Sequence, residues 1–211
     1  MRRKSWWLVL GGVVLAGLAV GAVGAAVPSR RAMWSVQFGT TSDDLVAAVA
    51  VSPTGCTYVY GQTAAALATN PNPLDPPQTD TDLFLACYDS SGSRRWVRQF
   101  GTTDNDTPGN QIAVAPNGDV YVVGTTRGEF PAQTSKNYDD FFVAKFTKRG
   151  VNSWTKQYGG DGNDQGWGIA RATNGDLYVS VNTDSSNFPG GSLGPNGAYG
   201  KMDSALVRLN R

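Results

Sequence analysis

The chain has 211 residues, of which 26 are glycine and 11 are proline, and it contains no histidine. This composition indicates one loop-rich domain and disfavours a mostly helical fold. A net charge of +1, with no basic run beyond the N-terminus, argues against a nucleic-acid partner. The lack of histidine excludes imidazole-based catalysis and imidazole metal sites.

The first element along the chain is apolar. Basic residues at positions 2–4 precede an uninterrupted apolar run over residues 6–27, which is long enough for a helix that crosses a bilayer. The same pattern fits a secretory signal that is cleaved after Ala25. Residues 1–27 are therefore predicted to be a signal peptide or an N-terminal membrane anchor, followed by a short linker over residues 28–33. Either way the rest of the chain is expected outside the cytoplasm, secreted or anchored to the membrane by residues 6–27.

Residues 34–211 contain an internal repeat in three copies. The segments WSVQFGTTSDD, WVRQFGTTDND and WTKQYGGDGND begin at Trp34, Trp96 and Trp154. Each is followed by a glycine three residues before a tyrosine, then by a variable stretch and a run such as DLFLACYD. A repeat of this length predicts a series of similar supersecondary units that pack against one another.

Each unit contains four strand-like runs. In the second unit we expect them at residues 111–115, 119–125, 140–147 and 153–158. The sequence PNG joins the first run to the second and KRG joins the third to the fourth, and both are typical of tight turns. The unit is thus predicted to be an up-and-down antiparallel sheet.

The second run of this unit, VYVVG, is apolar at successive positions and therefore on both faces. A sheet with one face in water would alternate between apolar and polar residues, whereas a sheet packed between two similar sheets would not. The predicted fold is all-β, with three four-stranded antiparallel propeller-type blades after the N-terminal hydrophobic helix. A β-sandwich is the alternative.

The order of motifs within the repeat resembles that of a known family. The order Trp-x-x-Gln-aromatic-Gly, Asp, Gly-x-x-Tyr-Val, Phe-Pro and Asp-x-x-x-Ala-Lys is similar to the bacterial beta-propeller repeat often called SBBP. The matching residues of the second unit are Trp96, Gln99, Gly101, Asp106, Gly118, Tyr121, Gly124, Phe130, Pro131, Asp140, Ala144 and Lys145. The third unit keeps Phe188 and Pro189, whereas the first has a proline-rich stretch instead. The resemblance implies a secreted or surface-displayed protein and no catalytic residues.

The repeat region does not begin and end at the boundaries of a four-strand unit. The segment from Trp34 onward is of the fourth strand type, and residues 205–211 are of the third strand type. Three units do not close an ordinary propeller, for which four is the usual minimum. We expect a homodimer in which each spare strand completes the other copy's last unit, giving a six-bladed ring. The alternatives are a monomeric arc with ends covered by loops, or a different protein that supplies the missing part.

One end of the units is the predicted ligand rim. The long loops over residues 63–81, 126–139 and 184–202 lie there, together with the loops that carry the repeated aspartates. The rim candidates are Asp44, Asp106, Asp164, Phe130, Tyr138, Phe188 and Tyr199. Carboxylates beside aromatic rings would suit a sugar, a cationic ligand or calcium. The alternative is that each aspartate accepts bonds from turn N–H groups and each Phe-Pro packs its own loop.

Two short motifs carry no function. GGDGND over residues 159–164 resembles a calcium-binding nonapeptide, but it occurs in a single copy with Gly166 where a large apolar residue is needed. GGSLG around Ser192 fits G-x-S-x-G but lies in a loop and has no histidine partner. No catalytic residue, cofactor or metal is expected, calcium at the rim being the one option left open.

The two cysteines lie in the first unit. Cys56 opens the second run and Cys87 lies near the end of the third, so antiparallel pairing brings them together. Their counterparts in the second unit are Asp119 and Lys145, which predicts a cross-strand polar pair. We expect a Cys56–Cys87 disulfide, which export permits; two free thiols are the alternative.

These features predict an exported, non-enzymatic repeat protein that acts as a binding or structural module at the cell surface or outside the cell. A lectin-like or calcium-dependent binder that uses the rim is the first alternative. A carboxylate-based hydrolase is the second, since two suitably spaced acids suffice for glycoside hydrolysis.

Overall fold

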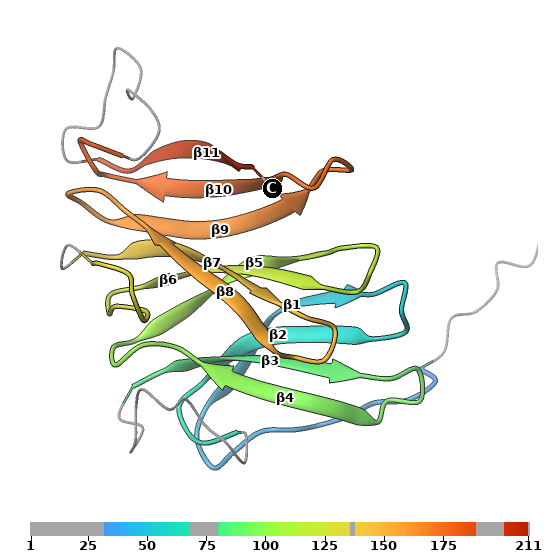
Figure 1. Cartoon of the computed structure of the whole chain (residues 1–211). Coiled ribbons are helices and arrows are strands. Elements are labelled where there is room, and N and C mark those ends of the chain that lie inside the picture. The colour runs from blue at the N-terminus through green and yellow to red at the C-terminus, as the bar shows by residue number, and fades with distance from the viewer. Residues whose placement is uncertain (1–31, 68–79, 136–137, 189–200, 211) are drawn as a thin grey trace, which may run out of the picture. The chain divides into compact units, whose positions relative to one another are not determined.

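The computed structural model describes residues 32–67, 80–135, 138–188 and 201–210, and all regular structure in these ranges is β-strand (Figure 1). The strands are β1 (Asp44–Val51), β2 (Thr57–Thr63), β3 (Asp82–Tyr88), β4 (Arg94–Phe100), β5 (Asp106–Val114), β6 (Val120–Thr126), β7 (Asp140–Phe146), β8 (Asn152–Tyr158), β9 (Asp164–Arg171), β10 (Leu177–Thr183) and β11 (Asp203–Leu209). The predicted all-β fold is confirmed for this part of the chain. The predicted helix and cleavage site over residues 1–27 lie outside the described residues.

Consecutive strands pair antiparallel into three sheets. Sheet 1 has the order β1-β2-β3-β4, sheet 2 the order β5-β6-β7-β8, and sheet 3 consists of β9, β10 and β11. The turns between the first two strands of the sheets contain Gly55, Gly118 and Gly175, with φ of 82°, 88° and 99°. Glycine suits these turns because it has no Cβ to clash at positive φ. Three sheets, each built from consecutive strands, also exclude a two-sheet sandwich for the described residues.

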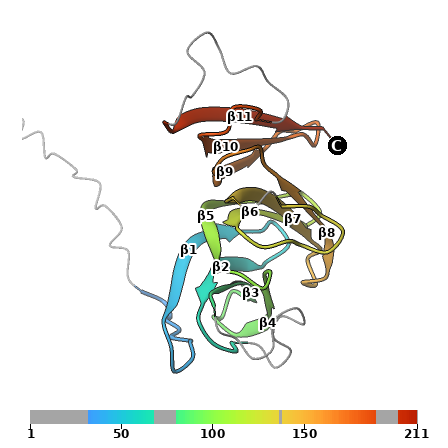
Figure 2. The same ribbon diagram turned by 90° about the vertical axis from the view of Figure 1, so that its left-hand side faces the viewer.

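The sheets pack face to face as successive layers (Figures 1 and 2). One apolar core lies between sheets 1 and 2 and includes Tyr58, Tyr60 and Val122. A second core lies between sheets 2 and 3 and includes Val123 and Val179. The neighbouring residues Val122 and Val123 of β6 thus enter different cores, which explains why this strand is apolar on both faces.

Three sequence expectations differ from the structure. Sheet 3 has three strands among the described residues and not the four predicted for a complete unit. The segment Trp34–Phe38, expected to be a strand, has no ladder partner in the described residues. The strand expected at 111–115 starts earlier, at Asp106, because the residues after Asp106 continue the ladder with β6 around an irregularity between Pro108 and Ile112.

No helix in the described ranges has the length and apolar character needed to cross a membrane.

Candidate ligand-binding site

A hollow of about 450 Å³ lies between sheets 2 and 3. It is lined by three aromatic and three basic side chains, and none of its lining residues is acidic. The aromatic residues are Tyr121, Trp154 and Tyr158, and the basic residues are Lys145, Lys156 and Arg171. The volume is within the range of small-molecule sites, and the combination of ring faces with positive charge favours an anionic ligand.

The three basic residues of the hollow have different partners. The Nζ atom of Lys145 lies 3.1 Å from Oδ2 of Asp119 and 5.6 Å from the centre of the Tyr121 ring, and the bond to Asp119 raises the pKa of Lys145. Arg171 donates from one terminal nitrogen to the Ala172 carbonyl at 3.2 Å, while its buried Nε finds no hydrogen-bond partner in the described residues. Lys156 is exposed. Lys156 is therefore the basic side chain most open to a ligand, and Arg171 adds positive charge to the lining.

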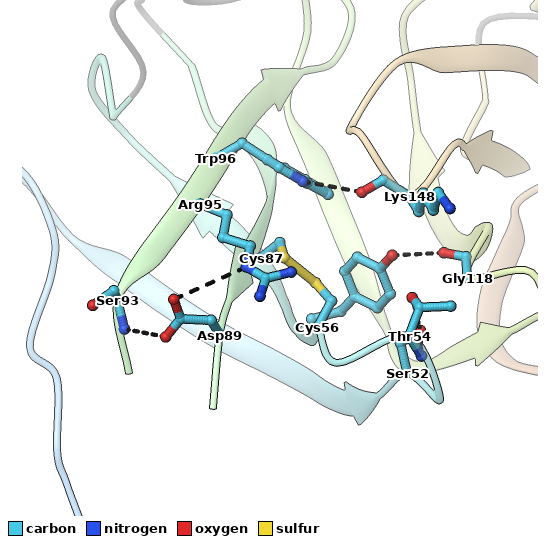
Figure 3. The surroundings of a disulfide bond; sticks show 11 residues. Ser52, Thr54, Cys56, Cys87, Asp89, Ser93, Arg95, Trp96, Gly118 and Lys148 are labelled. Atoms are coloured by element: carbon cyan, nitrogen blue, oxygen red, sulfur yellow. Dashed lines mark hydrogen bonds and ion pairs between the residues drawn. A yellow bond between two sulfur atoms is a disulfide. The ribbon is translucent and has the colours of Figure 1, made fainter. Parts of the chain in front are cut away.

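The corresponding place between sheets 1 and 2 is partly filled (Figure 3). There the indole Nε1 of Trp96 donates to the Lys148 carbonyl at 3.2 Å. A Cβ at Gly150 would lie 2.9 Å from the Trp96 ring, so the turn between β7 and β8 sits directly on the indole. In the part of the chain that the structure covers, sheet 3 has no such turn over Trp154. The hollow is therefore wider here than at the earlier junction.

The three predicted rim aspartates are the first residues of β1, β5 and β9, and not loop residues as the sequence suggested. Each carboxylate accepts a hydrogen bond from the backbone N–H four residues earlier. The bonds run from Thr40 to Asp44 (2.5 Å), from Thr102 to Asp106 (2.7 Å) and from Gly160 to Asp164 (2.6 Å). The aspartates thus close the loop that leads into each sheet, as in the alternative reading of this repeat.

Asp106 and Asp164 are fully buried. The pKa of Asp106 is raised to about 7, and burial is the main cause; the bonds from Thr126 and Thr102 lower this pKa, and the nearby carboxylates of Asp82 and Asp80 raise it. Burial also raises the pKa of Asp164. In the described residues no group of three or more acidic, histidine or cysteine side chains is placed to hold a metal ion.

The predicted rim aromatics separate into buried and exposed side chains. Phe130 packs on Phe142 with ring centres 4.9 Å apart, and Phe188 packs on Phe141 at 6.0 Å. Tyr138 is exposed, and Tyr199 lies outside the described residues. The two phenylalanines are thus part of the cores and do not form a ligand face with the aspartates.

The glutamine of Trp-x-x-Gln has a role that the sequence did not reveal. Gln157 in β8 donates to Oδ2 of Asp140 at 2.9 Å and to the Gly128 carbonyl at 3.0 Å, and it accepts from the Phe130 N–H at 3.2 Å. Gln99 in β4 makes the same three kinds of contact in sheet 1, with Asp82, Ala65 and Leu67. The glutamine therefore fastens the long loop to the fourth strand in sheets 1 and 2. The recurrence of this glutamine in all three copies was the sequence feature that could have indicated a structural role.

The cross-strand positions of the cysteines differ chemically among the sheets. Cys56 and Cys87 form a disulfide with a Cα–Cα distance of 5.6 Å, which confirms the predicted bond (Figure 3). The predicted polar pair in sheet 2 is the Asp119–Lys145 ion pair. In sheet 3 Arg208 lies 2.6 Å from Asp176 in the same place. All three sheets are thus tied between their second and third strands.

The segment that includes β4, β5 and β6 contains all three repeated structural residues. They are the turn glycine, the aspartate that closes the loop and the glutamine that holds the long loop. Residues 95–131 match the family model of the SBBP beta-propeller repeat. The resemblance deduced from the sequence is confirmed over this segment. Gln99, Asp106 and Phe130 lie within the match, so the beta-propeller repeat is defined partly by residues that hold its own loops.

A curated relative also matches. The chain is 31% identical over 199 residues to a protein of Caulobacter vibrioides named "Regulatory protein FlaEY". The alignment includes 89% of this chain but only 20% of the relative. The chain therefore spans about a fifth of the length of that protein.

Proposed function

We propose that this protein is a non-enzymatic binding module of propeller-type blades that acts outside the cytoplasm. The observation that carries the proposal is the hollow between sheets 2 and 3, where aromatic faces and basic groups meet and no lining residue is acidic. Such a lining can hold a ligand but has no acid–base pair with which to cleave one.

The ligand class follows from the lining. Trp154 and Tyr158 offer ring faces for a sugar or another flat group, and Lys156 with Arg171 offers positive charge to an anion. A sugar ring that bears a carboxylate combines both features. We therefore propose an acidic oligosaccharide, such as an oligomer of hexuronic acid, as the ligand.

The engagement of the acids supports a non-enzymatic role. Asp106 and Asp164, two of the three repeated aspartates, are buried and bonded to their own loops. Glu129 is the only glutamate of the chain, and it accepts a bond from the Ser135 N–H. A glycosidase requires two acids that face a substrate from opposite sides.

Two features support a location outside the cytoplasm. The basic and apolar residues of the first 27 positions have the pattern of an export signal or anchor, and a disulfide ties sheet 1. Disulfides persist chiefly in oxidising compartments.

The test is isothermal titration calorimetry, in which a hexuronate oligomer is added to the full chain in mild detergent. Binding is expected, and Lys156→Glu should weaken it by about tenfold through charge reversal. Lys201→Glu, which alters an exposed lysine away from the hollow, is the matched control and should leave affinity unchanged. Absence of binding, or equal losses in both variants, would refute the hollow as the site.

A parallel calcium titration followed by melting curves tests the rim alternative. The proposal expects no shift of the melting temperature with calcium. A shift that disappears in Asp161→Asn, an exposed aspartate of the loop before β9, would favour a calcium-dependent rim over the hollow.

A further inference from the structure

Exposed apolar side chains gather on the outer face of sheet 1. Val46, Val49 and Val51 of β1 are 58%, 65% and 74% exposed. By register they share the face of Phe84, Ala86 and Tyr88, which points away from sheet 2. Contiguous apolar surface of this kind marks an interaction site in a protein exposed to water.

The segment Trp34–Phe38 lies on the same face. Phe38 packs edge-on against Phe84 at 5.7 Å, and the Trp34 Nε1 donates to the Ser90 carbonyl at 3.1 Å. This is how Trp96 of β4 bonds to sheet 2. Trp34–Phe38 is therefore placed as the fourth strand of a preceding sheet, although no strand pairs with it in the described residues.

Sheet 3 has the complementary deficiency. Within the described ranges β11 pairs with β10 alone, so its other edge presents unpaired backbone groups. Leu206 of β11 is 73% exposed on the outer face of the sheet. In sheets 1 and 2 the corresponding edges of β3 and β7 are covered by β4 and β8.

The internal junctions show which contacts such an edge makes. Gln99 donates to Asp82 and Gln157 donates to Asp140, each from a fourth strand to the start of a third strand. The third members of these two sets are Gln37 and Asp203. In the described residues Gln37 lies in the segment without a ladder partner, and Asp203 lies in β11, whose outer edge is open. The chain thus carries both halves of a third contact of the same kind.

The outer faces also match. Tyr58 donates its hydroxyl to the Gly118 carbonyl of the next sheet at 2.6 Å. In the repeat alignment Tyr178 of sheet 3 corresponds to Tyr58, and Gly55 of sheet 1 corresponds to Gly118. The donor and the acceptor of another such bond are therefore available on the outer faces of sheets 3 and 1.

We infer that sheet 3 of one copy of this chain docks on the outer face of sheet 1 of a second copy, with the second copy's Trp34–Phe38 added along β11. The register of β3 with β4, in which Cys87 faces Trp96 and Leu83 faces Phe100, sets the new ladder. Arg208 faces Trp34 and Ser204 faces Phe38. Addition of a strand to an open edge is a common mode of recognition. When both copies make this contact, six sheets enclose a common axis.

The proposed junction is more polar than the internal ones. Ser180 and Ser204 occupy the places held by Tyr60 and Leu83 in sheet 1. Burial of less apolar area gives a weaker association. The dimer is therefore reversible, and its population depends on protein concentration.

The test is sedimentation velocity of the full chain in non-ionic detergent over a concentration series. The wild type is expected to dimerise, and Val49→Asp and Leu206→Asp should each raise the dissociation constant by roughly tenfold or more, because each places a charge in the junction. Val151→Asp, at an exposed valine in the turn between β7 and β8, is the matched control and should dimerise as the wild type does. An equimolar mixture of the two junction variants should regain dimers, since one junction then contains neither aspartate.

Three results would overturn the inference. The first is a wild type that stays monomeric at all concentrations. The second is a dimer whose dissociation constant rises in only one of the two variants, which would mean that sheet 1 pairs with sheet 1 or sheet 3 with sheet 3. The third is a dimer that neither variant affects, which would place the contact elsewhere, including residues 1–31. Circular dichroism checks folding, and Val46→Asp with Ser204→Asp supplies a second pair of variants at exposed positions of the same two faces.

Discussion

Sheets 1 and 2 have the same strand order, and the later halves of their first strands pair in the same register, yet their first strands differ in exposure. Val49 and Val51 of β1 are largely exposed, whereas their counterparts Ile112 and Val114 in β5 pack on the core between the two sheets. The residue types are nearly the same. The comparison teaches that a neighbouring sheet, and not the strand's own sequence, decides whether these positions are buried.

The two sheets also differ in the bond between their second and third strands. Sheet 1 has the Cys56–Cys87 disulfide, and sheet 2 has the Asp119–Lys145 ion pair at the same place. A disulfide restricts the unfolded chain, whereas an ion pair that is still partly exposed contributes a smaller free energy. The unfolding of sheet 1 should therefore depend on redox state and that of sheet 2 should not.

Removal of the disulfide is the largest expected effect. The two cysteines are 31 positions apart, and closing a loop of that size stabilises a protein by about 3–4 kcal/mol in the chain-entropy model. The Cys56→Ala/Cys87→Ala variant should lose about this much free energy of unfolding in urea. Reductant should destabilise the wild type equally and leave the variant unchanged; a redox-independent wild type would contradict the bond.

Conversion of the sheet 2 tie into a disulfide is the next test. Asp119→Cys with Lys145→Cys places thiols where sheet 1 has them, and the new bond should add about 2 kcal/mol to the free energy of unfolding. Thiol titration without reductant should find no free cysteine. Asp119→Ser with Lys145→Ser is the control for loss of the ion pair. Free thiols in the double-cysteine variant would show that sheets 1 and 2 are not equivalent at this cross-strand position.

The buried aspartate at the start of sheet 2 gives a pH dependence. Because the pKa of Asp106 is raised to about 7, the folded protein keeps a proton that the unfolded chain releases above about pH 4. Stability should therefore fall as pH rises from about 4 to 7, by at most about 1.4 kcal/mol per pH unit.

Asp106→Asn should flatten this profile in urea unfolding measured at several pH values. Asp104→Asn, which changes an exposed aspartate in the same loop, should keep the wild-type slope. An unchanged slope in Asp106→Asn would refute the role of this carboxyl.

The smallest effect is expected from the exposed ion pair in the long loop of sheet 2. Arg127 and Asp139 lie 3.0 Å apart, with the arginine side chain 63% exposed. Arg127→Ala should lower the free energy of unfolding by less than about 1 kcal/mol. A much larger loss in urea unfolding would indicate that this pair, and not Gln157, holds the loop.

Much of the site chemistry followed from repetition in the sequence. The loop-closing alternative for Asp44, Asp106 and Asp164 was visible because they recur at one offset, and the disulfide because both cysteines replace a polar pair. The role of Gln99 and Gln157 was not visible, since a glutamine three residues after a tryptophan does not show which loop carbonyl and N–H it will meet. The hollow was missed because its lining comes from two sheets.

The sequence by itself determined most of the strands, their turns and their antiparallel order, because glycine placement and apolar runs act over a few residues. It also determined that the middle sheet is covered on both sides, since only such a sheet tolerates apolar residues on both faces. The tertiary structure alone decided which carboxylates are buried, where aromatic and basic side chains meet, and which faces stay open. These properties depend on how one sheet lies on the next, and contacts between distant residues set that arrangement.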